Sequence, residues 1–195
     1  PGAAALAVVS AAVLGGAALL QDRLSGVLKQ YLVAPVPRTA ILVGAVAGAV
    51  TKALLQAVVV LALAGAVGAR FLPETAGLVA AAAGLVAFTV GFAAFAAYFA
   101  GLASSMAAYH AVIMVFNVPI LFVSSALYPL DRLPGWLQAL ALLNPTTYVV
   151  ELLRLGLLGV ASPVPVPAAL AVLMAFGALG VLAGSRGARR WATPQ

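Results

Sequence analysis

The sequence predicts an all-α protein in which about five apolar helices form a polytopic transmembrane bundle. Hydrophobic residues make up 65% of its 195 residues and charged residues only 7%, whereas about 25% of the residues in a soluble domain are charged. The mean hydropathy is +1.19. The apolar runs are long and unbroken, unlike the alternating strands of an outer-membrane barrel. Such a chain cannot cover its surface with charge, and we therefore expect residues 1–195 to form a single transmembrane domain.

The first predicted span, Ala3–Leu20, is rich in alanine and glycine and just long enough to cross a bilayer. It leads into the polar segment 21–38. In that segment, apolar residues recur at the spacing of an amphipathic helix, which prolines then end. The apolar stripe consists of Leu24, Val27, Leu28, Tyr31 and Leu32.

The second predicted span is Thr39–Ala69. As a straight helix its 31 residues would be about 46 Å long, which exceeds the ~30 Å hydrocarbon core. We therefore expect its first part to lie at the interface, where the Lys52 side chain reaches the lipid headgroups. The alternative is that Lys52 is a functional charge inside the membrane. Gly44 and Gly48 are spaced for close helix packing.

Three further spans are predicted, at 76–103, 111–127 and 168–184. A short turn, Ser104–His110, joins the first two of them. In the span 76–103, glycines recur every seven residues and place a smooth stripe on one helix face, which favours close packing against another helix. These glycines are Gly77, Gly84 and Gly91.

Residues 128–163 form a cap between the last two spans. The segment contains two short apolar pieces separated by Asn144-Pro145, and neither has the ~20 apolar residues that spanning requires. Non-helical backbone at membrane depth is tolerated only where protein or water satisfies its polar groups. We therefore expect short re-entrant or interfacial helices here.

The loop charges predict an orientation. Positive residues gather in the segment 21–38 and at the C-terminus, which lie on the same side of a five-span chain. Because cytoplasmic loops are enriched in lysine and arginine, this side is predicted to be cytoplasmic and the cap external. The residues concerned are Arg23, Lys29, Arg38, Arg186, Arg189 and Arg190.

The stretch from Ser124 to Arg154 carries a family resemblance. It contains Ser124-Ser125 and Pro129, then Leu133-Pro134-Gly135-Trp136, then Asn144-Pro145-Thr146-Thr147-Tyr148, and finally Arg154. In order and spacing it resembles the second half of the membrane subunit of ABC-2 type exporters. In that family a helix ends in small residues, and a "P-x-x-x-L-P-x-W" loop and an "N-P-x-x-Y" element ending in arginine follow.

The segment 21–38 carries the second resemblance. It is similar to the cytoplasmic coupling helix of this family, "E-R-x-x-G-T-L-E-x-L-L-x-x-P-x-x-R", although Val27 and Lys29 stand where the family often has Thr and Glu. The resemblance implies docking on an ATPase subunit. Periodicity alone would favour an amphipathic helix lying on lipid. The residues predicted to dock are Asp22, Arg23, Leu24, Gly26, Leu28, Leu32, Pro35 and Arg38.

The resemblance further implies a permease subunit of an ATP-driven exporter in a bacterial plasma membrane. Two such subunits, identical or paralogous, would pair, and separate ATPase subunits would use the ATP. No directly bound cofactor is expected. The family normally has one more spanning helix upstream. Because the sequence starts with Pro1 directly before an apolar run, we interpret it as an N-terminally truncated piece.

Two sets of candidate site residues follow. Asn117, Pro119, Ser124 and Ser125 are candidates for the pathway, although an interhelical hydrogen bond and a tolerated proline explain the first two equally well. Glu151 and Arg154 share a helix face, and we expect a partly buried ion pair that holds the cap closed. The complete set of cap or gate residues is Pro129, Pro134, Trp136, Asn144, Pro145, Tyr148, Glu151 and Arg154.

Other functions have little support in the sequence. There is no cysteine and one histidine, so neither catalytic thiols nor a His cluster for metal is expected. Nucleotide-binding and hydrolase motifs are missing, and no catalytic residue is predicted. The net charge of +6 reflects topology rather than nucleic acid binding. The rivals are an ATP-independent secondary transporter or channel, which would need midplane ionisable groups, and a lipid-modifying enzyme, which would need a catalytic cluster.

Overall fold

The computed structural model describes residues 1–27 and 38–190, and all regular structure in this part is helical. Four of its helices are long and apolar enough to cross a membrane, and a fifth apolar helix has 17 residues. The predicted all-α membrane bundle is thereby confirmed. The long helices are α1 (Gly2–Leu24), α3 (Arg38–Ala66), α4 (Thr75–Leu102) and α8 (Val166–Arg190), with α5 (Met106–Phe122) beside them.

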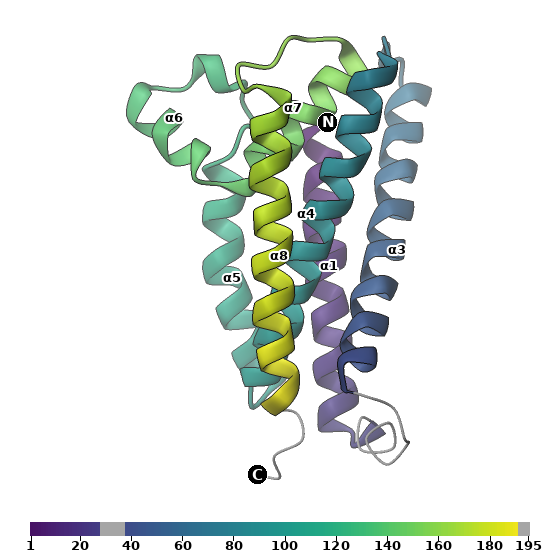
Figure 1. Ribbon diagram of the computed structural model, residues 1–195, viewed down its shortest axis with the longest axis vertical. Coiled ribbons are helices and arrows are strands. Elements are labelled where there is room, and N and C mark those ends of the chain that lie inside the picture. Colours follow the sequence, from purple (N-terminus) through teal and green to yellow (C-terminus); the bar gives the residue numbers. More distant parts are fainter. Residues whose placement is uncertain (28–37, 191–195) are drawn as a thin grey trace.

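The long helices run side by side along the long axis of the molecule (Figure 1). Helix α4 is central and contacts α1, α3, α7 and α8. The short elements η1 (Leu130–Arg132), α6 (Gly135–Leu142) and α7 (Pro145–Leu158) gather at the end of the bundle where α1 begins (Figure 1). We call this end, with residues 128–163, the cap end.

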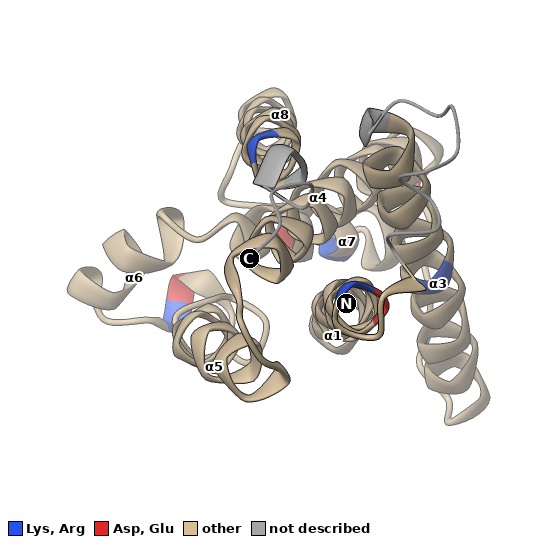
Figure 2. Cartoon of the chain, turned by 90° about the horizontal axis from the view of Figure 1, so that it is seen from below, with Lys and Arg blue, Asp and Glu red and all other residues tan. Residues whose placement is uncertain are grey.

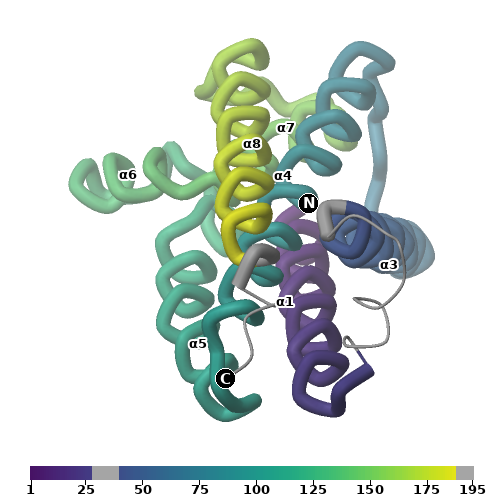
Figure 3. The backbone as a smooth tube through the Cα atoms, turned by 60° about the horizontal axis from the view of Figure 1, so that its bottom comes forward, coloured from purple at the N-terminus to yellow at the C-terminus, as the bar shows by residue number. Residues whose placement is uncertain are grey.

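The opposite end is where α1 and α8 finish and α3 starts (Figure 1). The described chain thus leaves α1, enters α3 and reaches the end of α8 at the end opposite the cap, as the order of the predicted spans requires. Seen from this end, charged residues are sparse across the bundle (Figure 2). Helix α6 projects sideways from the bundle (Figures 2 and 3).

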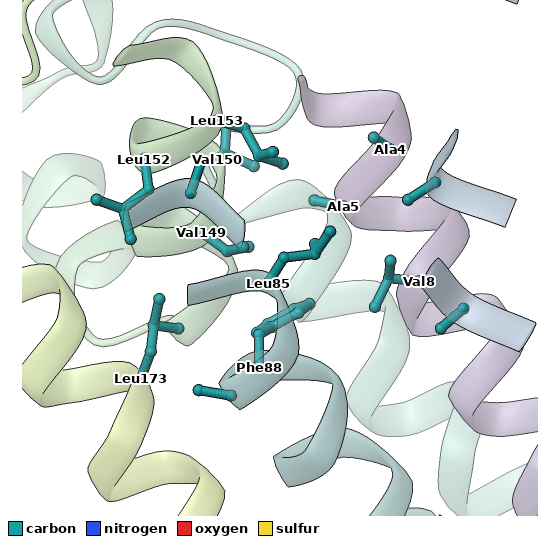
Figure 4. Close-up of a cluster of buried hydrophobic side chains, with 14 of the residues drawn as sticks. Ala4, Ala5, Val8, Leu85, Phe88, Val149, Val150, Leu152, Leu153 and Leu173 are labelled. Atoms are coloured by element: carbon teal, nitrogen blue, oxygen red, sulfur yellow. The ribbon is translucent and has the colours of Figure 1, made fainter. Parts of the chain in front are cut away.

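The core combines many small residues of α1 and α4 with larger side chains of α4 and α7. Val149 and Val150 are fully buried against α4 and α1 (Figure 4). Phe88 of α4 lies in the same cluster, beside Val8 of α1. Because α7 is only 14 residues long, about 21 Å as a helix, it cannot span the bilayer. It is instead inserted into the cap end of the bundle.

The predicted glycine stripe of α4 does allow close packing. A Cβ on Gly156 of α7 would lie 2.6 Å from the Gly77 carbonyl oxygen, and one on Gly180 of α8 would lie 2.5 Å from that of Gly91. These helices therefore touch backbone to backbone. Gly44 and Gly48 differ, because a Cβ there would meet nothing within 4 Å. Their face of α3 has no close neighbour in the described part of the chain.

The predicted span 111–127 is wrong at both boundaries. Helix α5 begins at Met106, because Ser105 caps it by accepting a hydrogen bond from the Ala108 N–H. What was predicted as a turn is thus mostly helix, and Tyr109 is buried, its hydroxyl donating to the Val13 carbonyl at 2.8 Å. The helix ends at Phe122, because the Ser124 hydroxyl and Asn144 bind its last carbonyls.

Candidate functional site

Asn144 joins two helix ends at the cap. Its Nδ2 donates to the carbonyls of Ile120 and Val123, each at 3.0 Å, and so satisfies groups that α5 leaves unpaired where it stops. Its Oδ1 accepts from the Thr146 N–H at 3.0 Å and caps the N-terminus of α7. Asn144 is only 7% exposed, and Pro145 follows at the first helical position. One side chain thus fixes α7 on the end of α5.

The next residues of α7 hold α6. The Thr147 hydroxyl donates to the Ala141 carbonyl at 2.7 Å, and the Tyr148 hydroxyl donates to the Leu142 carbonyl at 2.7 Å. Both carbonyls lie at the C-terminal end of α6, where no intrahelical donor is available. The run from Asn144 to Tyr148 is therefore a set of capping groups for neighbouring helices.

Arg154 ties α7 to the loop after α5. Its Nη1 donates to Glu151 Oε1 at 2.9 Å, and its Nη2 donates to the Ser125 carbonyl at 2.7 Å. The predicted Glu151–Arg154 contact is therefore present. Glu151 is 3% exposed, and the Arg154 side chain is 18% exposed. This is the only ion pair among the described residues, and it lies in a partly desolvated setting where its loss is costly.

The remaining cap candidates have simpler roles. Pro129 precedes η1 and Pro134 precedes α6, each in an extended conformation that begins the helix. Trp136 is 69% exposed on the projecting helix α6, where an amphipathic ring suits a membrane interface. The structure thus gathers all of the predicted cap residues at one end of the bundle.

The four pathway candidates separate into two kinds. Asn117 and Pro119 lie on α5 and are exposed, and Asn117 borders a small cavity of about 40 Å³ between α1, α4 and α5. Ser124 and Ser125 are buried, and Ser125 Oγ makes a long hydrogen bond of 3.4 Å to the Thr147 carbonyl. The pathway role of all four stays a prediction.

At the other end of the bundle, Arg23 makes a contact that the sequence did not indicate. From the last turn of α1, its Nη1 donates to the carbonyls of Ala100, Gly101 and Ala103 at 3.2, 2.9 and 3.2 Å. These groups are the unpaired carbonyls at the C-terminus of α4, where a cation is favoured. We call this contact the Arg23 clamp.

The other docking candidates are only partly covered. Asp22 and Leu24 belong to the last turn of α1, and Leu24 is 51% exposed. Gly26 follows with φ +82°, a left-handed conformation that glycine adopts without strain. Leu28, Leu32 and Pro35 lie outside the described residues. Arg38 begins α3, and its side chain is also outside the described part.

Lys52 lies near the middle of α3, on an exposed face. Since α3 starts at Arg38, Lys52 is about 21 Å along the helix axis. It forms no ion pair with the described residues. Those residues also hold no group of three or more His, Asp or Glu side chains that could bind a metal.

Comparison with known proteins gives one family and a few short similarities. The family pattern described as "ABC-2 type transporter" matches residues 1–158. The protein named "Putative transport permease ycf38" of Cyanophora paradoxa is 57% identical over 44 residues, which is 23% of this chain and 15% of that protein. Proteins of the same name are 52% identical over 44 residues in Porphyra purpurea and 54% identical over 41 residues in Pyropia yezoensis. The matched stretches thus cover only about one seventh of these relatives.

Proposed function

Because this chain belongs to the ABC-2 type transporter family, we propose that it is the membrane-spanning permease subunit of an ATP-driven exporter. The subunit moves its substrate outward across the plasma membrane, and a separate ATPase subunit binds ATP and supplies the force. The chain itself is a multi-pass membrane protein, with four helices long enough to span. The observation that carries the proposal is the family match, which extends from α1 to the end of α7.

The Arg23 clamp supports a mechanical role for the end of the bundle opposite the cap. The chain leaves α1 directly after the clamp and enters the segment 25–37, which we propose as the docking site of the ATPase. A displacement of this segment pulls on α1, and the clamp passes it to α4 through hydrogen bonds to three carbonyls. Helix α4 contacts most of the remaining bundle, so the clamp couples the docking segment to the spans.

The cap end is proposed as the outer gate. Its helices α6 and α7 are tied to α5 through Asn144 and Arg154, so movement of α5 and movement of the cap are linked. We propose that the Glu151–Arg154 pair holds the cap over the pathway in the resting state. The C-terminus would then face the cytoplasm. A second permease subunit, identical or paralogous, completes the pathway.

A secondary transporter is the alternative. Such proteins place ionisable side chains at membrane midplane to couple ion and substrate movement. Within the described spans, Lys52 is the single charged side chain far from a helix end. One lysine without a carboxylate partner among the described residues is a poor ion-coupling relay, so we favour the ATP-driven function.

The test is reconstitution with a candidate ABC ATPase subunit from the same organism. We expect the two proteins to co-purify, and we expect transported substrates to stimulate ATP hydrolysis in proteoliposomes. Replacing the P-loop lysine of the ATPase should abolish transport. Transport that persists with that variant and follows a proton or sodium gradient would favour the alternative instead.

The Arg23 clamp gives a second test in this chain. Arg23→Gln keeps a donor but loses the charge and the reach to three carbonyls. We expect the ATPase to bind normally and to hydrolyse ATP, while transport per ATP falls several-fold. Arg70→Gln, at an exposed loop of the cap end, is the matched control and should behave as the unmodified protein. Equal transport by the two variants would remove the clamp from the mechanism.

A further inference from the structure

A cavity of about 550 Å³ opens beside α7 at the cap end. Its walls come from η1, from the C-terminal half of α7 and from the connector that leads to α8. The charged residues in the wall are Asp131, Glu151 and Arg154. The size falls within the range of small-molecule sites, about 300–1,000 Å³. We propose that this cavity binds the primary ammonium group of a small amphiphile.

Glu151 supplies the main reason. It is 3% exposed and lines the cavity, so its carboxylate is buried everywhere except toward that space. Arg154 occupies Oε1, while Oε2 makes no hydrogen bond with any described residue. Among the described residues, the Thr146 hydroxyl is the fully buried side-chain polar atom that lacks a partner, so Glu151 Oε2 keeps access to the cavity. A ligand that brings an N–H group into the cavity therefore finds an acceptor at Oε2 beside the one ion pair that Glu151 makes with a described residue.

The charges in the wall favour a cation over an anion. Two carboxylates face one guanidinium, and both terminal nitrogens of Arg154 are already engaged, by Glu151 and by the Ser125 carbonyl. An anion would therefore find no free arginine fork of the kind that binds carboxylate or phosphate. Asp131 is exposed and forms no ion pair in the described chain, so its charge is available to a cationic ligand.

The chemistry of the wall favours an amine over a metal ion. Calcium takes six to eight oxygen ligands, and no group of three or more His, Asp or Glu side chains occurs in the described part of the protein. An ammonium group donates up to three hydrogen bonds, which suits Glu151 Oε2 and the Asp131 carboxylate. Pro129, Leu158 and Val160 complete an apolar wall for the hydrocarbon part of the ligand.

Two sources supply this chemistry, an aminophospholipid of the surrounding bilayer and a free alkylamine. The probe is n-hexylamine, which is protonated at pH 7 because alkylammonium groups titrate near 10.4. It is titrated calorimetrically into the protein in phosphatidylcholine nanodiscs, with empty nanodiscs as the blank. Hexanol and hexanoate serve as neutral and anionic probes of the same apolar length.

We expect hexylamine to bind at one saturable site at least tenfold more tightly than hexanol. Asp131→Asn and Glu151→Gln should each weaken it about fivefold, the effect of losing one partly exposed ion pair. Because Asp131 is exposed, its replacement should leave the buried core unchanged, and a weaker affinity then reports the lost charge. Glu74→Gln is the matched control, since it removes the same charge at the same end of the bundle from an exposed residue outside the cavity, and it should bind hexylamine unchanged.

Competition identifies the source. If replacing one fifth of the phosphatidylcholine by phosphatidylethanolamine weakens hexylamine binding, the site takes the lipid headgroup; if binding is unaffected, it takes free amines. Equal affinity for hexylamine and hexanol would overturn the proposal, as would equal losses in Asp131→Asn and Glu74→Gln, or no loss in either cavity variant. The titration contains neither nucleotide nor ATPase, so its failure leaves the exporter proposal untouched.

Discussion

Arg154→Ala is the variant for which the structure gives the most detailed expectation. It removes the 2.9 Å contact to Glu151 and the 2.7 Å contact to the Ser125 carbonyl. A hydrogen bond to a charged group contributes about 1.5–3 kcal/mol, and splitting a fully buried ion pair costs about 3–5 kcal/mol. Since the Arg154 side chain is 18% exposed, we expect the lower end of that range. The free energy of unfolding should fall by about 3 kcal/mol.

Glu151→Ala should be milder, because Arg154 keeps its contact with Ser125 and reaches solvent. We expect a loss of about 2 kcal/mol. The double variant should lose about 3–4 kcal/mol rather than the sum, which corresponds to a coupling energy of about 1–2 kcal/mol. Unfolding in mixed micelles with increasing SDS measures all four proteins of the cycle. In proteoliposomes without ATP, both single variants should also leak substrate through the resting pathway.

Arg132→Ala is the matched control for this cycle. Arg132 is exposed and forms no ion pair within the described residues, so its replacement should change stability by less than about 0.5 kcal/mol. Strictly additive losses in the cycle would refute the reasoning about the pair. Tight resting vesicles in both single variants would refute the gate while leaving the structural contact intact.

Three other predictions follow from the topology, the docking segment and the cap. In this cysteine-free chain, a cysteine at Trp136 should react with an impermeant maleimide in intact cells, whereas one at Lys29 should not; labelling at Lys29 would overturn the orientation. Leu28→Asp should leave membrane insertion unchanged but weaken ATPase co-purification and uncouple hydrolysis from transport, and wild-type values of both would exclude docking there. Thr147→Val removes a 2.7 Å hydrogen bond and should lower the free energy of unfolding by about 1–2 kcal/mol. Thr146→Val should cost almost nothing, because the buried Thr146 hydroxyl has no partner among the described residues. Equal losses in the two variants would contradict this prediction.

The fold was largely predictable because each span is a long apolar run. The span predicted at 76–103 agrees with α4, Thr75–Leu102, within one residue at each end. The boundaries predicted for the next span, 111–127, were wrong because Ser104-Ser105 and His110 resemble a polar turn. One of those serines caps the following helix, and the tyrosine at 109 finds its partner on α1, 96 residues away in the sequence. Local composition carries no information about such a partner.

The candidate site was predictable only where its contacts join residues that are close in sequence. Glu151 and Arg154 are close in sequence, so helical spacing alone predicted their contact. The bond from Arg154 to the Ser125 carbonyl joins residues 29 positions apart, and the Arg23 clamp joins residues 77–80 positions apart. Asn144 marked a break in the apolar pattern. Its second role is to donate hydrogen bonds to the last carbonyls of α5. That role could not be predicted without knowing where α5 ends.

The central helix α4 predicts that the two ends of the bundle move at the same time during transport. It is a continuous helix of 28 residues, about 42 Å long. Arg23 grips its last carbonyls, while Gly77 in its first turn lies against the backbone of α7 at Gly156. Because α4 is a continuous helix with contacts at both ends, a displacement of one end also displaces the other end at the same time. Fluorescent reporters at the two ends should therefore change together after ATP is added, with a single rate constant and no lag.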